Sequence, residues 1–534
     1  MGHDATIDSS EKGSIGDITF SGPLHLDFKN VDVAIGLATG HAEDEDLSPE
    51  ESRRIRNKLD RHLLPLLFII YCMLYIDKGA LASSSILGIL TDAHLTTDDF
   101  NTLGSAFSIG FLVFEYPQNL ALQRFPVGKW LTFNVFLWCI FLGLHPVCHN
   151  FSSLFALRFF LGATEGSMMA GLMLVTSMYY TRTEIGERLG WTFQCFGFAT
   201  IISGFLSFAV FHASPKAHPN QWQWLMIVIT IMTFIVFVLF LFFFPDNPTT
   251  ARFLTEEEKV KVVKRVQGNQ NGIETKVWKK EQFMEALTDV KTWLFFFFAT
   301  IANLQNGLQV QYSIIIKSFG FTTLQTTLLN IPSGFSSIIG VTLACYLLRR
   351  FPNSRAWINI TFWIPSIVGA LVQICLPFKH KVGHLIAIYI TNFGGIPGFV
   401  MTMSWVASTS AGHTKRLTVN SIFIIGYALG QILCTQFWKE QYRPRNIVPW
   451  SINLATYFIN ITLILVTRYV FVTENKRRDA LQAEAEASGK SLAAFDDMGY
   501  IGGVDENGKQ VRIRVEKSML DMTDKENLAF RYVL

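Results

Sequence analysis

The chain has 534 residues, of which 50% are hydrophobic and 16% are charged, and its formal net charge is +3. Soluble domains carry about 25% charged residues, so this composition argues against a soluble enzyme. The small net charge gives no reason to expect nucleic acid as a partner. The first fifty residues are polar and lack the apolar core of a signal peptide. The seven cysteines show no CxxC or Cys/His spacing, so neither a disulfide framework nor a metal site is indicated.

Twelve apolar runs follow one another along the chain, each long enough to cross a bilayer core about 30 Å thick. Six lie in the first half, over residues 62–88, 101–121, 129–147, 154–179, 190–211 and 222–245. After a polar stretch, six more follow over residues 292–315, 324–348, 355–377, 384–408, 417–438 and 449–472. The sequence therefore predicts an all-α membrane protein with twelve transmembrane helices in two six-helix bundles, 62–245 and 292–472.

Basic residues in the short connections indicate which side of the membrane each connection occupies. Lys and Arg precede the first run and join runs 2–3, 4–5, 8–9 and 10–11, whereas the connections after runs 1 and 3 carry none. The connection between runs 11 and 12 is an exception, with Lys439, Arg443 and Arg445. This distribution predicts three cytosolic segments, the N-terminal tail 1–61, the central loop 246–291 and the C-terminal tail 473–534.

Charged side chains inside the spans are concentrated in the first half, at Asp77, Lys78, Glu115, Arg158 and Glu165. Each costs about 2.5–3.5 kcal/mol at the centre of a membrane helix, so each needs a partner or a function. Two six-helix halves are typical of secondary transporters that bind substrate near the midplane. A twelve-helix scaffold or receptor is the alternative, and the intramembrane charges favour the transporter.

Arg158 and Glu165 lie two helical turns apart on nearly the same face, about 10 Å along the axis. Gly162 and Gly166 have the GxxxG spacing that lets a neighbouring helix approach closely. We expect Glu165 to load and release a coupled proton, with Asp77 as the second candidate for this role. The alternative is an Arg158–Glu165 pair that serves only the structure.

Asp77 and Lys78 are neighbours in sequence, so their side chains point about 100° apart on a helix. We expect Lys78 to face the cavity as an anion anchor and Asp77 to pair with an adjoining helix. Glu115 lies near the cytosolic end of its run, just before Pro117, where it can pair with Arg124 of the following loop. Glu115 and Arg124 are therefore our candidates for a conformational latch.

The cores of the second-half spans contain amides in place of charges, which suits hydrogen bonding to a substrate. The seventh run, residues 292–315, has a broad polar side as a helix, because Gln305 and Gln309 are four residues apart and Asn303 and Asn306 are three apart. Further amides in these spans are Gln311, Asn330, Asn392 and Asn420. A packing role for these amides is the alternative. The predicted substrate-binding residues of the two halves are Lys78, Arg158, Asn303, Asn306, Gln309 and Asn392.

Several segments together resemble the fungal anion:cation symporter branch of the major facilitator superfamily, the allantoate permease family. Residues 115–126 read EYPQNLALQRFP, and residues 158–166 read RFFLGATEG, close to the family's E-x-P-x-N-x-x-L-x-R-x-P and R-x-x-L-G-x-x-E patterns. Matching segments also occur at residues 244–255, 285–293, 320–329 and 523–532. The resemblance covers nearly everything from about residue 55 to the end.

The resemblance implies proton-coupled movement of small organic anions, such as allantoate, nicotinate or pantothenate, at a fungal plasma membrane. It implies that transport uses a basic residue of the first run and an Arg and a Glu of the fourth run. In this sequence these residues are Lys78, Arg158 and Glu165. It also implies that the loop containing Arg124 latches the two halves when the cavity faces outward. The sequence departs from the family at Gln118, where Ser is usual, and lacks the Asn that follows Lys78 in the family pattern.

We therefore expect a secondary transporter, not an enzyme, that takes up a small carboxylate together with protons. Export of a metabolite across the plasma or vacuolar membrane is one alternative, and a receptor that binds the solute without moving it is another. The expected partners are an anionic small molecule, protons and the lipid bilayer. We expect function as a monomer in the plasma membrane, with no cofactor and no metal.

Overall fold

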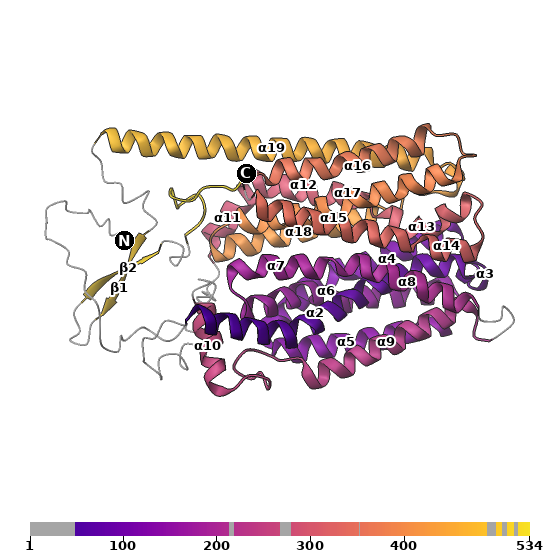
Figure 1. Cartoon of the computed structure of the whole chain (residues 1–534), viewed down its shortest axis with the longest axis horizontal. Helices are drawn as coiled ribbons and strands as arrows, with labels where there is room; N and C mark the ends of the chain where they lie inside the picture. Colours follow the sequence, from indigo (N-terminus) through magenta and orange to yellow (C-terminus); the bar gives the residue numbers. More distant parts are fainter. Residues whose placement is uncertain are drawn as a thin grey trace.

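The computed structural model of the chain describes residues 48–212, 218–267, 279–351, 353–488, 498–504, 510–516 and 522–534. Most of the N-terminal tail predicted at 1–61 lies outside the described residues, as does the part of the central loop between 268 and 278. The described chain forms two helical bundles that lie side by side (Figure 1). Each bundle has its own hydrophobic core.

The first bundle contains the helices of the N-terminal half. They are α2 (Pro49–Ile86), α3 (Ile89–Asp92), α4 (Thr97–Arg124), α5 (Val127–Leu144), the 3-10 helix η2 (His145–Val147), α6 (Phe151–Tyr179), α7 (Arg182–Phe193), α8 (Cys195–Phe211) and α9 (Gln221–Phe243). The helices α10 (Glu256–Gln267) and α11 (Lys280–Thr288) follow in the central loop.

The second bundle contains the helices of the C-terminal half. They are α12 (Val290–Leu304), α13 (Gly307–Ser318), α14 (Thr323–Leu329), α15 (Ile331–Arg350), α16 (Arg355–Cys375), α17 (Lys381–Ser408), α18 (His413–Leu433), the 3-10 helix η3 (Glu440–Tyr442) and α19 (Ile447–Ala487). After them, β1 (Met498–Val504) pairs antiparallel with β2 (Gln510–Glu516), a hairpin that the sequence analysis did not predict.

The predicted fold class, an all-α membrane protein, is confirmed. Within the described residues, ten helices are long and apolar enough to cross a membrane. The other two predicted spans, runs 2 and 7, fall on α4 and on α12 with α13. Four charged residues make α4 less apolar than its neighbours. The seventh run is divided at Gln305 and Asn306 into helices of 15 and 12 residues, each shorter than a full span.

The two ends of the bundle pair differ in what projects from them. One end holds α10, α11 and residues 522–534, and we name it the α10–α11 end; α3 lies at the opposite, α3 end (Figure 1). The 41 residues of α19 correspond to about 60 Å of helix, twice the thickness of a bilayer core. Both α2 and α19 therefore extend beyond the membrane, and they do so at the α10–α11 end.

Helices α4 and α6 pack closely because two glycines leave no side chain between them. A Cβ atom built on Gly162 would lie 1.9 Å from the carbonyl oxygen of Phe107, and one on Gly110 would lie 1.9 Å from that of Phe159. At Gly166 the nearest atom, the carbonyl oxygen of Phe111, would be 3.6 Å away, which is an ordinary contact. Of the GxxxG pair in α6, Gly162 thus sets the helix separation, and this separation fixes where Glu165 lies.

This difference gives a stability test with a built-in control. We expect Gly162→Ala to lower the free energy of unfolding by about 3 kcal/mol, because its methyl group must push two packed backbones apart. Gly166→Ala should change it by less than about 1 kcal/mol, since the methyl group fits. Thermal unfolding of the two purified variants, followed by size-exclusion chromatography, measures the difference. Equal unfolding temperatures would show that the close packing is not needed.

Candidate functional site

A cavity of about 220 Å³ lies between the two halves, and side chains of both line it. The first half contributes residues of α2, α4, α6 and α8, and the second contributes residues of α12, α13, α15, α17 and α18. Among the described residues that line the cavity, the charged side chains are Lys78 and Arg158, and no carboxylate is present. The cavity wall is therefore positive on one side.

Lys78 projects from α2 into the cavity, and its side chain is 33% exposed. Its Nζ atom lies 3.6 Å from Oε2 of Glu165 on α6. The same atom lies over two aromatic rings, 5.9 Å from the centre of Tyr75 and 5.4 Å from that of Phe107. Glu165 is 2% exposed and does not line the cavity. The ammonium group thus connects the cavity to the carboxylate buried behind it.

Asp77 points away from the cavity, toward α5. It is fully buried, and its Oδ2 accepts a hydrogen bond of 3.2 Å from Nε1 of Trp138. Arg158 lines the cavity but is only 3% exposed. One polar atom of each charged group, Asp77 Oδ1, Arg158 Nη2 and Glu165 Oε1, is buried without a hydrogen-bond partner in the described part of the chain. These atoms can take a proton or bind an anion without breaking an existing bond.

The alternative of a structural Arg158–Glu165 pair receives no support from these contacts. The ion pair that Glu165 makes is with Lys78, and within the described residues no ion pair joins Glu165 to Arg158. The guanidinium of Arg158 therefore lines the cavity without a hydrogen bond or ion pair to a carboxylate in the described part of the chain, although Asp77 and Glu165 lie within electrostatic reach. A bidentate cation of this kind fits a carboxylate or phosphate.

On the opposite wall, breaks in the helices bring the amides to the cavity. α12 ends at Leu304 and α13 begins at Gly307, so Asn303, Asn306 and Gln309 lie around the interruption and line the cavity. A Cβ atom on Gly307 would lie 2.0 Å from the carbonyl oxygen of Cys434, which shows how closely α13 approaches the end of α18. Discontinuous helices of this kind are typical of substrate sites at the midplane of transporters.

Hydrogen bonds fix the orientation of these amides, starting from a group that can only accept. The carbonyl oxygen of Ala299 accepts a hydrogen bond of 2.7 Å from Nδ2 of Asn303. The Oδ1 of Asn303 therefore accepts from Nδ2 of Asn306 at 2.7 Å and from Nε2 of Gln431 at 3.3 Å. This order leaves the side-chain oxygen of Asn306 as an acceptor for a ligand, and that of Gln431 has only a weak contact of 4.0 Å from Cys434 Sγ and can accept as well. Nδ2 of Asn392 likewise donates to Ser333 Oγ at 2.7 Å.

The six predicted substrate-binding residues, Lys78, Arg158, Asn303, Asn306, Gln309 and Asn392, all line this one cavity. The sequence analysis missed other residues of the wall, namely Tyr75, Tyr312, Tyr427 and Gln431. Tyr75 precedes Lys78 by three residues and so shares its helix face, a signal that was available in the sequence. Two intramembrane amides, Gln311 and Asn420, are not among the lining residues.

Gln311 instead helps to close the α3 end of the cavity. Its Nε2 donates to Oδ1 of Asn101 on α4 at 2.5 Å, and Nδ2 of Asn101 donates to the carbonyl oxygen of Trp438 at 2.9 Å. Close by, Ser105 Oγ lies 2.8 Å from Thr435 Oγ1. These contacts join the first half to the second between the cavity and α3, so the structure represents a state sealed at that end.

The sequence matches the profile of the Major Facilitator Superfamily over residues 67–435. The chain is a member of the major facilitator superfamily. It is 32% identical to an uncharacterized transporter of Schizosaccharomyces pombe, over 99% of this chain and 92% of that protein. Two Saccharomyces cerevisiae relatives, a high affinity cysteine transporter and allantoate permease, are 29% and 28% identical over 92% and 94% of this chain and 92% and 90% of their own lengths.

The fold is also that of a solved transporter structure. A bacterial homologue of the human lysosomal transporter Spinster aligns with a TM-score of 0.53 at 13% identity, covering 77% of this chain and 97% of its own. The relatives are transporters, so the expectation that this chain is not an enzyme is confirmed. The resemblance to the allantoate permease family, drawn from its motifs, is confirmed as well.

The loop between α4 and α5 of this major facilitator protein is held by a residue that the sequence analysis did not select. Oδ1 of Asp246, just after α9, accepts a hydrogen bond of 2.9 Å from the backbone N–H of Lys129. The predicted partners are apart in this state, because Glu115 Oε1 accepts from Asn119 at 3.0 Å and Arg124 is exposed. Within the described residues, no hydrogen bond or ion pair of Arg124 is formed.

We expect Asp246→Asn to slow transport about tenfold while leaving the affinity for substrate within about twofold. The reason is that a hydrogen bond to a charged acceptor is worth about 1.5–3 kcal/mol, and this one lies far from the cavity. Lys129→Ala is the control, because it keeps the backbone N–H and removes only an exposed ammonium 4.0 Å from Asp246.

Arg124→Ala should also slow turnover without weakening the binding of substrate. Equilibrium binding of substrate and the initial transport rate, measured on the same preparations, test these expectations. A large loss of substrate affinity would contradict the role of a latch.

Proposed function

We propose that this protein is a secondary transporter that takes up a small organic anion together with protons across the plasma membrane. One observation carries the proposal, namely that Lys78 and Arg158 line the cavity while no described carboxylate does. The carboxylates that balance these two cations lie behind the wall, so the cavity surface itself presents positive charge that suits an anion. The relatives named for allantoate and for cysteine support a small organic substrate.

The charges around the cavity support coupling to protons. Lys78 and Arg158 are balanced by Asp77 and Glu165, so the group is neutral when all four are ionised. Binding an anion alone would leave a net negative charge in the membrane, which is unfavourable at low dielectric. Protonation of Glu165 frees Lys78 from its ion pair and restores neutrality when the anion binds. Proton and anion then favour each other's binding.

The opposite wall supports a substrate that has hydrogen-bonding groups besides its anionic end. Lys78 and Arg158 can only donate, whereas the oriented carbonyl oxygens of Asn306 and Gln431 can accept. A molecule with a carboxylate and an N–H or O–H group would therefore bind with its carboxylate toward α2 and α6. Its donors would lie toward α13 and α18.

The basic connections support an orientation with the α10–α11 end in the cytosol, and the resemblance to the allantoate permease family supports uptake at the plasma membrane. The seal at the α3 end then closes the cavity from outside, as in a transporter ready to release substrate inward. Residues from the two halves of a single chain line both walls of the cavity, and we propose the monomer as the transporting unit. Export and a non-transporting receptor are the other readings, and flux measured in both directions in proteoliposomes separates all three.

The anionic character of the substrate is tested at Arg158. We expect Arg158→Ala to weaken binding about 100-fold, because it removes a two-pronged, charge-assisted contact worth about 3 kcal/mol. Arg158→Lys should recover only part of this loss, since an ammonium cannot donate in the same fork. Asn420→Ala changes an intramembrane polar residue away from the cavity and serves as the control. A neutral or cationic best substrate in a broad uptake screen would refute the proposal.

Proton coupling is tested at Glu165. We expect Glu165→Gln to abolish concentrative uptake, because the amide cannot exchange a proton, while substrate counterflow continues in part. Uptake by the unmodified protein should alkalinise the medium and stop with a protonophore. Asp98→Asn is the control, since it makes the same carboxyl-to-amide change at an exposed residue that does not line the cavity. Full concentrative uptake by the Glu165 variant would show that another group carries the proton.

A further inference from the structure

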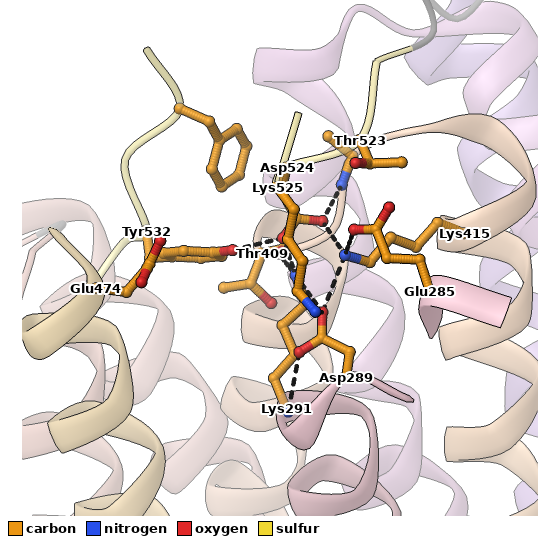
Figure 2. A network of polar contacts seen from close by, with 12 residues as sticks. Glu285, Asp289, Lys291, Thr409, Lys415, Glu474, Thr523, Asp524, Lys525 and Tyr532 are labelled. Carbon is orange, nitrogen blue, oxygen red and sulfur yellow. Dashed lines mark hydrogen bonds and ion pairs between the residues drawn. The ribbon is translucent and has the colours of Figure 1, made fainter. Parts of the chain in front are cut away.

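The C-terminal segment 522–534 returns to the C-terminal half and lies against it at the α10–α11 end (Figure 1). Its residues contact α12, α18 and α19, which lie far apart in the sequence, and Lys525 pairs with Asp289 just after α11 (Figure 2). The sequence analysis singled out residues 523–532 as a motif, and the transport site uses none of them. The segment therefore needs an explanation of its own.

Asp524 is the centre of these contacts and is fully buried. One carboxylate oxygen, Oδ1, lies 2.9 Å from Nζ of Lys415 on α18. The other, Oδ2, forms an ion pair with Lys291 on α12 and accepts a hydrogen bond of 2.5 Å from the Tyr532 hydroxyl. A single side chain of the tail thus joins the ends of two membrane helices (Figure 2).

The two lysines are buried too deeply to be stable without these carboxylates. Lys415 is fully buried and also contacts Glu285 at 2.6 Å and Asp289 at 2.9 Å. Burial raises the pKa of Asp524, but the ammonium groups of Lys291 and Lys415 outweigh it and lower the pKa to about 2. Asp524 is therefore ionised at every physiological pH, and protonation does not release it.

A second set of contacts holds the backbone of the segment. The guanidinium of Arg478 on α19 is 1% exposed and donates to the carbonyl oxygens of Asp524 at 2.8 Å and Phe530 at 2.6 Å. The ring of Tyr532 stacks on Phe471 with ring centres 4.8 Å apart. Nε1 of Trp405 donates to the carbonyl oxygen of Val533 at 2.8 Å. The surface thus recognises a peptide by its carboxylate, its carbonyl groups and an aromatic ring.

The two helices that Asp524 joins are among those that line the cavity, and each leads toward the seal. α12, together with α13, runs from Lys291 past Asn303 to Gln311 at the seal. α18 runs from Lys415 past Gln431 to the contact at Thr435. A change in the spacing of their ends at the α10–α11 end is therefore transmitted to the substrate site.

We propose that residues 522–534 are an intramolecular peptide ligand whose binding to the ends of α12, α18 and α19 switches transport on. With the segment bound, α12 and α18 are clamped together and move as one body. With it released, Lys291, Lys415 and Arg478 lose partners and the amide wall of the cavity loses its fixed geometry. The readout by flux rests on the proposed transport function, whereas binding of the peptide itself does not.

The test separates the segment from the folded protein. A protease site placed after Ser488, which is exposed at the end of α19, allows cleavage after the full chain has folded into proteoliposomes or detergent. High salt then removes the cleaved segment. We expect transport to fall about tenfold or more on removal, and a synthetic peptide of residues 522–534 to restore it in a dose-dependent manner.

Peptide variants identify the contact that matters. The Asp524→Asn peptide should bind the stripped protein about 100-fold more weakly, because two buried ammonium groups lose their counter-charge. The Lys525→Ala peptide is the control, since Lys525 is 47% exposed and lies 3.8 Å from Asp289 at the rim. Fluorescence anisotropy of labelled peptide measures binding without reference to transport.

Peptide binding and flux together decide whether the segment is a switch. Peptide binding with restored flux supports the switch. Peptide binding without any effect on flux overturns the switch and leaves a passive tether, and unchanged flux after the segment has been removed overturns it as well. If the stripped protein unfolds and peptide does not restore it, the segment is only a part of the folded core, and the proposal fails. Failure of the uncleaved protein to transport any anion would count against the transport function, not against the peptide site.

Discussion

The ion pair between Lys78 and Glu165 is the contact on which the rest of the site depends, because it lies where charge is least tolerated. At 3.6 Å inside the bundle, it joins a carboxylate behind the cavity to an ammonium at the cavity surface. Breaking it costs free energy unless both partners are satisfied in another way. A proton on Glu165 and an anion on Lys78 do this together, and linkage requires that each raises the affinity for the other.

The two halves differ in how they form the walls of the cavity. The first half keeps its four charges in place by close packing, with Gly110 and Gly162 bringing α4 and α6 into backbone contact. The second half carries breaks at Gln305–Asn306 and near Asn330, where amides replace regular helix. A rigid, charged wall faces an interrupted, hydrogen-bonding wall, so rearrangement of the cavity is easier on the second side.

The sequence was sufficient for the fold and for much of the cavity, because both follow from the cost of burying polar groups in lipid. Apolar runs located the helices, and the charges and amides inside them all needed a common place to meet, so Lys78 and Asn303 could be placed at one cavity. Pairings could not be predicted, because they depend on how helices rotate and approach. Glu165 therefore pairs with Lys78 and not with Arg158, and Asp246, which lies outside the spans, escaped notice.

The two charged clusters of this protein illustrate opposite uses of the same physics. Around the cavity, atoms such as Arg158 Nη2 and Glu165 Oε1 are buried without hydrogen-bond partners, so a ligand or proton can change their state with little to break. At the C-terminal segment, both carboxylate oxygens of Asp524 are bonded, lysines of two helices supply its counter-charges, and Arg478 of a third donates to its backbone carbonyl oxygen. A cluster in which every charged group has a partner resists protonation. It loses all of these contacts together when the C-terminal segment leaves. A site that must cycle with each turnover needs the first arrangement, and an on–off clamp needs the second.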